Sequence, residues 1–188
     1  MQYIKGIDNY HGTNETAITF GIFDGLHQGH NLLILCVEEH QNKDLVDGVV
    51  VAFDMEPLFK KQNKDYDVLM TNYEKAEMLK DRIHYFVDCP FDEKIASMEA
   101  ETFIEKVIVG VFHAKYVVVG MDFCFGYQKK GDIHMLKKNS DKYGYQVEIF
   151  KKIQYEGREI SSTYIKEEVN KGNVELANRL LGHKLIES

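Results

Sequence analysis

The sequence is poor in the residues that mark cross-linked or linker-rich proteins. It has 2 prolines, 3 cysteines and no tryptophan among 188 residues. So few prolines leave little room for a proline-rich linker. The cysteines, Cys36, Cys89 and Cys124, are odd in number and far apart. They indicate neither a disulfide framework nor a zinc ribbon, and we expect them to be free thiols.

Long apolar runs and an excess of basic residues are also missing. No run of about 18 apolar residues occurs, and the first twelve residues lack the apolar core of a signal peptide. We therefore expect a cytoplasmic protein. The 23 basic and 30 acidic residues give a net charge of −7, which argues against a general nucleic-acid or anionic-membrane partner. Any affinity for phosphate must come from a local group of residues and not from the net charge.

The apolar residues are arranged as alternating strands and helices. Short β-branched runs lie near residues 17–20, 48–53, 85–87 and 116–119, and segments with helical spacing separate them. A further half-exposed strand is expected at 145–150 and an edge strand near residues 3–7. This order predicts one α/β domain over residues 1–188, with a Rossmann-like, doubly wound parallel sheet of about five strands. Ligands should bind at the carboxyl ends of the strands.

Residues 16–30, TAITFGIFDGLHQGH, combine an apolar run, a glycine-rich turn and a helix predicted to begin at His30. Gly21 and Gly25 let the backbone turn sharply and approach a ligand, and the first N–H groups of a helix attract anions. His27 and His30 are three residues apart, so both imidazoles can reach one bound group. The stretch therefore predicts a phosphate site whose imidazoles stabilise charge that develops in the transition state.

Two other interpretations of this stretch stay open. His27 and His30 could hold a metal ion with Asp24 as a third ligand, although no further histidine or cysteine cluster obviously completes the shell. The glycines could also serve packing alone, as is common in turns between a strand and a helix. The pattern HxGH directly after a strand favours the phosphate site over both.

The residues GIFDGLHQGH resemble the GxFDGxHxGH signature of the bacterial FAD synthetase (FMN adenylyltransferase) module, which belongs to the HIGH-type nucleotidyltransferase superfamily. The resemblance covers nearly the whole chain. It implies ATP and FMN as substrates, transfer of AMP to FMN to give FAD and pyrophosphate, and Mg²⁺ as the ion that accompanies ATP. It also implies catalytic roles for Asp24, His27 and His30, and contacts with ATP or its phosphates at Gly21, Phe23 and Gly25.

Two further segments resemble the parts of the family that lie near the flavin. The end of the run at 48–53 corresponds to a family turn that lines the flavin, which implies that Phe53 and Pro57 are flavin neighbours. Residues 120–126, GMDFCFG, are followed by KKGD and resemble the family motif G-[FRE]-[DN]-F-x-F-G. This match implies contacts with the flavin or its phosphate at Asp122, Phe123 and Phe125.

A hydroxyl cluster, ISSTYIK at residues 160–166, opens another predicted helix. Such hydroxyls are typical of an N-cap, and they also suit a phosphate chain. The segment resembles the family signature ISSTRIR, which implies that Ser162, Thr163 and Lys166 hold the leaving phosphates. Both arginines of the signature are replaced, by Tyr164 and Lys166. Arginine clamps phosphate with two hydrogen bonds, whereas lysine acts as a point charge.

Two functions from other classes stay open. The chain could be a diverged flavin- or nucleotide-binding protein without turnover, as the replaced arginines suggest, or a nucleotidyltransferase with another phosphorylated acceptor. In many bacteria a riboflavin kinase domain follows the FAD synthetase module. This chain ends after LLGHKLIES, so we expect no kinase activity from it. The sequence does not indicate an oligomeric state.

Overall fold

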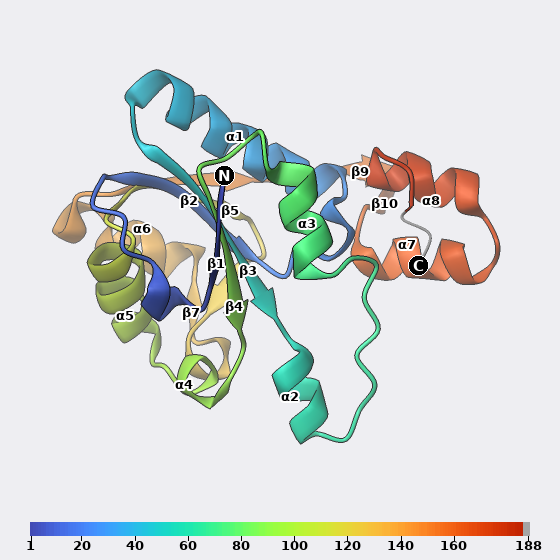
Figure 1. Ribbon diagram of the computed structural model, residues 1–188, viewed down its shortest axis with the longest axis horizontal. Coiled ribbons are helices and arrows are strands. Elements are labelled where there is room, and N and C mark those ends of the chain that lie inside the picture. Colours follow the sequence, from blue (N-terminus) through green and yellow to red (C-terminus); the bar gives the residue numbers. More distant parts are fainter. Residues whose placement is uncertain (186–188) are drawn as a thin grey trace.

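A six-stranded parallel sheet crosses the centre of the computed structural model, which describes residues 1–185 (Figure 1). Every neighbouring pair of its strands runs parallel. The predicted α/β fold with about five strands is confirmed, and the short N-terminal edge strand is the sixth. The strand order is β1 (Gln2–Lys5), β4 (Tyr85–Pro90), β3 (Asp47–Asp54), β2 (Thr16–Gly21), β5 (Ala114–Gly120) and β8 (Gln146–Phe150).

Helices cover both faces of the sheet, because the central strands carry apolar side chains on both faces. One face packs against α1 (Gln28–Asp44) and α3 (Asn72–Leu79), and the other packs against η3 (Phe103–Val111) and α6 (Ile133–Tyr143). Neighbouring residues of one strand alternate between these two clusters: Ala17, Val50 and Val118 join the first, and Ile18, Val51 and Val117 join the second.

The order of the strands places a crevice beside β2. The chain leaves β2 for β3 on one side and later returns to β5 on the other side, so the direction of winding switches between β2 and β5. In open parallel sheets ligands bind outside the carboxyl ends of the strands at such a point. Those ends are Gly21 in β2 and Gly120 in β5.

A separate helical pair follows the sheet. Helices α7 (Ser162–Asn170) and α8 (Val174–Leu181) form their own apolar cluster beside the hairpin of β9 (Gln154–Tyr155) and β10 (Arg158–Glu159), at the right of Figure 1. The Gln28 side chain in α1 donates to the Arg179 carbonyl at 2.6 Å, which fastens this unit to the start of α1. The unit therefore lies directly beside the crevice.

The remaining elements are short, and most of them follow a strand end. They are η1 (Ile7–Asn9), η2 (Asp24–Leu26), α2 (Glu56–Lys61), α4 (Glu93–Ala96), α5 (Ala100–Thr102), β6 (Cys124–Phe125), η4 (Tyr127–Lys129) and β7 (Gly131–Asp132). Among residues 1–185, no helix has the length and apolar character needed to span a bilayer. All three cysteines are free thiols, as predicted.

Candidate active site

The turn between β2 and α1 has a left-handed backbone at several positions. Phe23, Gly25 and Leu26 have φ of 52°, 78° and 43°. At Gly25 a Cβ atom would lie 2.8 Å from the Leu69 Cδ1 atom and 3.0 Å from the Leu181 Cδ2 atom. Glycine suits this position, because L residues are strained at this φ and a Cβ atom would displace the Leu69 and Leu181 side chains.

The helix after this turn begins earlier than the sequence predicted. It starts at Gln28, with His27 as its N-cap, so the predicted start at His30 was wrong. The reason is that the His27 ring replaces the usual capping hydroxyl: its Nδ1 atom accepts the N–H of His30 at 3.4 Å. Since Nδ1 is the acceptor, the hydrogen of a neutral His27 ring sits on Nε2.

His27 and His30 lie together, as their spacing predicted. Their rings stack with centroids 3.6 Å apart. Burial lowers the pKa of His27 to about 4, and it holds the pKa of His30 well below its ordinary value, with His27 and Lys75 lowering it further. Both rings are therefore neutral at pH 7 and act through hydrogen bonds rather than full charges. Among residues 1–185, the buried Nδ1 atom of His30 has no hydrogen-bond partner.

Asp24 joins three parts of the chain. Its buried carboxylate accepts the N–H groups of Leu69 and Met70 at 2.7 and 3.3 Å and forms an ion pair of 2.9 Å with Lys166. Its carbonyl oxygen accepts the Ser162 hydroxyl at 2.9 Å. These contacts hold the segment before α3 and the start of α7 against the turn. Catalytic and phosphate-binding roles for Asp24 and Lys166 stay predictions.

An aromatic cavity of about 450 Å³ opens at the carboxyl ends of β2, β3 and β5. The structure brings four predicted flavin neighbours together in its wall, Phe53, Asp122, Phe123 and Phe125. Pro57 lies outside this wall, in α2, and lines a different hollow. Seven phenylalanines that line the cavity give it flat, apolar sides: Phe20, Phe23, Phe53, Phe91, Phe103, Phe123 and Phe125. A planar ring system suits such a space.

A polar cleft of about 300 Å³ lies between the N-termini of α1 and α7. Its lining includes the predicted Ser162 and Thr163 together with Lys151 and Lys152, which the sequence analysis missed. Their place in the sequence, as a pair of basic residues directly after a strand, could have indicated that they lie near the site. Free N–H groups at two helix N-termini, together with nearby hydroxyls and lysines, suit a phosphate chain.

The two cavities share one wall. His30, Leu33, Gly120 and Asp122 line both of them. On the cleft side, Lys152 holds the Asp122 carboxylate at 3.1 Å. A phosphate placed between the cavities would therefore lie against His30, with the stacked His27 ring beside it. This shared wall is where a group could pass from one bound molecule to another.

Lys75 supports the turn from within α3, a role that the sequence analysis missed. Its side chain is 1% exposed, and its Nζ atom donates to the Ile22 carbonyl at 2.9 Å and to the Asn72 Oδ1 atom at 2.8 Å. Burial lowers the pKa of Lys75 to about 8. The signal in the sequence was a lysine four residues before Leu79, on the apolar face of the helix.

Oxygen ligands for a magnesium ion are present, although few side chains supply them. Asp122 places a carboxylate on the shared wall, and Ser162 and Thr163 bring hydroxyls to the cleft. This set fits an ion that phosphate oxygens hold for the most part. The alternative metal site at Asp24, His27 and His30 is not supported among residues 1–185, because Lys166 and backbone N–H groups occupy the Asp24 carboxylate.

Comparison with known proteins agrees with this geometry. A family model described as FAD synthetase matches residues 10–164. A protein of Buchnera aphidicola is 32% identical over 185 residues, and one of Escherichia coli is 29% identical over 195. Both are named bifunctional riboflavin kinase/FMN adenylyltransferase. Each match covers 97% of this chain but 59% or 60% of the relative, so the chain spans about three fifths of their length.

A solved structure from Streptococcus pneumoniae, described as a macrolide-efflux protein, has the same fold. It superposes with a TM-score of 0.82 at 24% sequence identity. The match covers 98% of this chain and 63% of that one. At this identity the likeness concerns the fold alone.

We predict that His27→Gln removes part of the pH dependence of folding stability. The folded protein keeps His27 neutral down to about pH 4, whereas the unfolded chain protonates it near its ordinary pKa of 6.5. The unfolded state thus binds more protons between these values, and stability falls as the pH falls through them. From pH 7 to 5 the wild type should lose about 2 kcal/mol more than the variant, measured by urea unfolding.

The matched control for this experiment is His134→Gln, which changes an exposed histidine. It should show the same pH dependence as the wild type. Equal losses in the wild type and in His27→Gln would contradict the assignment of His27 as a neutral, buried imidazole.

Proposed function

This chain belongs to the FAD synthetase family, and on that premise we propose that it transfers AMP from ATP to the phosphate of FMN, giving FAD and pyrophosphate. The observation that carries the proposal is the wall that the aromatic cavity and the polar cleft share at His30. A reaction that joins a flavin phosphate to a nucleotide phosphate needs two such spaces that meet at the phosphates.

The chemistry of each cavity assigns its substrate. The isoalloxazine ring of FMN is flat and largely apolar, so it fits between the phenylalanines of the aromatic cavity. The triphosphate of ATP fits the polar cleft, where Lys151 and the N-terminus of α7 offset its charge. The FMN phosphate and the α-phosphate of ATP then meet beside His27 and His30.

The proposed reaction is an in-line displacement at phosphorus. A phosphate oxygen of FMN forms a bond to the α-phosphorus of ATP, and the bond from that phosphorus to the bridging oxygen of pyrophosphate breaks. The Nε2–H group of His27 and the His30 ring donate hydrogen bonds to the oxygens where negative charge grows. No side chain acts as a nucleophile, because positioning and electrostatic stabilisation lower the barrier.

We propose Mg²⁺ as the ion that accompanies ATP, and when bound it would screen the charge of the phosphates. Asp122 is exposed and would hold the ion once its carboxylate exchanges Lys152 for it, with the Ser162 and Thr163 hydroxyls nearby in the cleft. We also propose that residues 1–188 act as one catalytic module in the cytoplasm, where ATP is available. The contacts of Asp24 with the segment before α3 and with α7 support a single module.

The direct test is product formation from purified protein, ATP, Mg²⁺ and FMN, with riboflavin replacing FMN in a parallel reaction. Chromatography should show FAD from FMN and no product from riboflavin. His30→Ala should reduce the rate at least about 100-fold, because it removes a donor at the reacting phosphate. His134→Gln, an exposed control on α6, should leave the rate unchanged.

Two results would overturn this assignment. If FMN gives no product while flavin fluorescence shows binding, the chain is a flavin-binding protein without turnover. If ATP is consumed with another phosphorylated acceptor and not with FMN, the chain is a nucleotidyltransferase of different specificity.

We further predict that Lys151→Met raises the KM for ATP about tenfold, which corresponds to about 1.4 kcal/mol. The reason is that Lys151 lines the cleft assigned to the triphosphate, where one charge-assisted contact has this value. The KM for FMN should change less than about twofold. Steady-state kinetics with each substrate varied in turn measures both constants.

Lys80→Met is the matched control, because Lys80 pairs with Glu77 at the end of α3 and should affect neither constant. A larger rise in the KM for FMN than in the KM for ATP would contradict the assignment of the cleft.

A further inference from the structure

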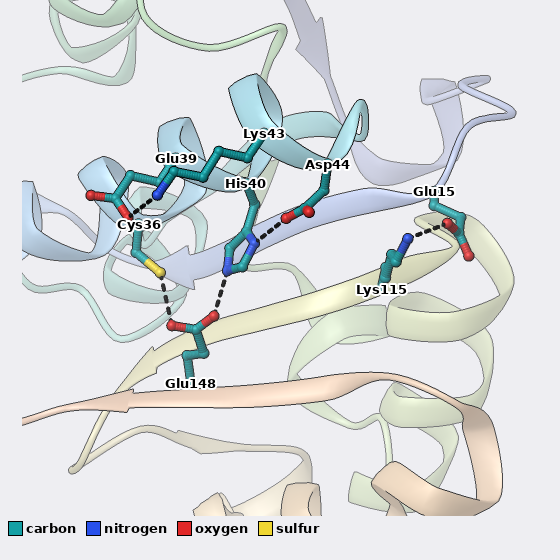
Figure 2. A network of polar contacts seen from close by, with 8 residues as sticks. All are labelled: Glu15, Cys36, Glu39, His40, Lys43, Asp44, Lys115 and Glu148. Carbon is teal, nitrogen blue, oxygen red and sulfur yellow. Dashed lines mark hydrogen bonds and ion pairs between the residues drawn. The ribbon is translucent and has the colours of Figure 1, made fainter.

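A second polar cluster joins α1 to β8, beyond the lining of the two cavities (Figure 2). Cys36, His40 and Glu148 each bring one ligand-type atom, and these atoms lie within 4.8 Å of one another. Cys36 and His40 are four residues apart, so α1 presents them on one face, while Glu148 reaches across from the middle of β8. The proposed reaction uses none of these residues.

Polar and aromatic contacts hold the cluster in place. The Cys36 thiol donates to the Glu148 Oε2 atom at 3.2 Å, and the other carboxylate oxygen of Glu148 contacts the Nε2 atom of His40. The Nδ1 atom of His40 lies 2.7 Å from the Asp44 Oδ2 atom. The imidazole also stacks on the Tyr116 ring with centroids 3.7 Å apart. The ring therefore has one fixed plane and a fixed partner at each nitrogen.

We propose that Cys36, His40 and Glu148 bind a divalent transition-metal ion of the zinc type. Sulfur, imidazole nitrogen and carboxylate oxygen are the three donor types that Zn²⁺ takes in proteins, usually in a tetrahedral arrangement. Magnesium prefers oxygen donors alone, so this ion differs from the one that accompanies ATP. The three donor atoms lie within 4.8 Å of one another, and the Cys36 Sγ and Glu148 Oε2 atoms are 3.2 Å apart.

The surroundings match those of known zinc-binding histidines. A metal-bound histidine usually donates its second N–H group to a carboxylate, which fixes the ring orientation and raises its basicity. Asp44 is that carboxylate here, at the Nδ1 atom of His40. Access is also present, because the side chains of His40 and Glu148 are 18% and 38% exposed. Water can fill the fourth position of the ion from this open side.

Binding replaces the thiol hydrogen of Cys36 with the metal ion. Burial and the neighbouring Glu148 raise the pKa of the Cys36 thiol to about 12, so the thiol is protonated without metal. Zinc takes cysteine as the thiolate, so the ion takes the place of the thiol hydrogen and this proton passes to water. The Nε2 atom of His40 coordinates through its lone pair, with the ring hydrogen on Nδ1 toward Asp44.

The ion would fix two walls of the polar cleft relative to each other. Helix α1 begins beside His27 and His30, and β8 ends directly before Lys151. A metal bridge between these elements would hold the imidazoles and the lysines at a constant separation. The inference of a metal site does not depend on the proposed function, because it uses other residues and other contacts.

Cobalt(II) tests the site, because it replaces zinc and reports its ligands by absorption. Titration of the metal-free wild type, kept reduced with a phosphine, should give one equivalent of Co²⁺, a thiolate-to-cobalt band in the near ultraviolet and visible bands of tetrahedral cobalt. Cys36→Ser should abolish the thiolate band. Asp44→Asn should keep the band but weaken binding about 10- to 100-fold. Zinc should bleach the spectrum and raise the unfolding temperature.

Two further variants keep the test decisive if Cys36→Ser does not fold. Glu148→Gln preserves size and hydrogen bonding but should lose tight binding. Cys124→Ser removes an exposed thiol elsewhere and should leave the spectrum and the stoichiometry unchanged. Absence of one bound equivalent in the wild type, or an unchanged thiolate band in Cys36→Ser, would overturn the proposal. A band that disappears in Cys124→Ser would show adventitious binding at the exposed thiol.

Discussion

The ion pair between Asp24 and Lys166 is the contact on which the candidate site depends. Asp24 is 6% exposed, and its carboxylate pairs with Lys166 at 2.9 Å while accepting two backbone N–H groups. Removing Lys166 would leave a buried carboxylate without its counter-ion, which would destabilise the folded protein. The pair brings the turn after β2, the segment before α3 and the start of α7 to one place, although they are far apart in sequence.

This constraint places two unlike spaces side by side. The turn faces an aromatic cavity on the sheet side and a polar cleft on the α7 side, and the two spaces meet at His30 and Asp122. Burial keeps His27 and His30 neutral. Neutral imidazoles suit a reacting phosphate, since they donate hydrogen bonds without forming a tight ion pair with the ground state. Positive charge comes instead from Lys151, farther along the cleft, since Lys152 is paired with Asp122 and Glu159.

Local patterns predicted much of the fold and the centre of the site. Apolar runs identified the strands, and the spacing of His27 and His30 placed both rings together. The resemblance to FAD synthetases groups Phe53, Phe123 and Phe125, which line one cavity, with Pro57, which lines another.

What could not be predicted is pairing across long separations. Lys166 in α7 pairs with Asp24 in the turn after β2, and Glu148 in β8 contacts Cys36 and His40 in α1. Periodicity gives the face on which a residue lies, but not its partner on another element. Lys75 was missed for a related reason: its helix places it on the apolar face, but its partner, the Ile22 carbonyl in the turn, lies on another element.

A crystal structure of this protein with FAD tests the central claim most directly, because one molecule must then occupy both cavities. The account predicts the flavin ring among Phe53, Phe123 and Phe125, the adenosine half in the polar cleft, and the pyrophosphate bridge within hydrogen-bonding distance of His27 or His30. FAD bound with its flavin outside the aromatic cavity, or with its phosphates away from both imidazoles, would contradict the account.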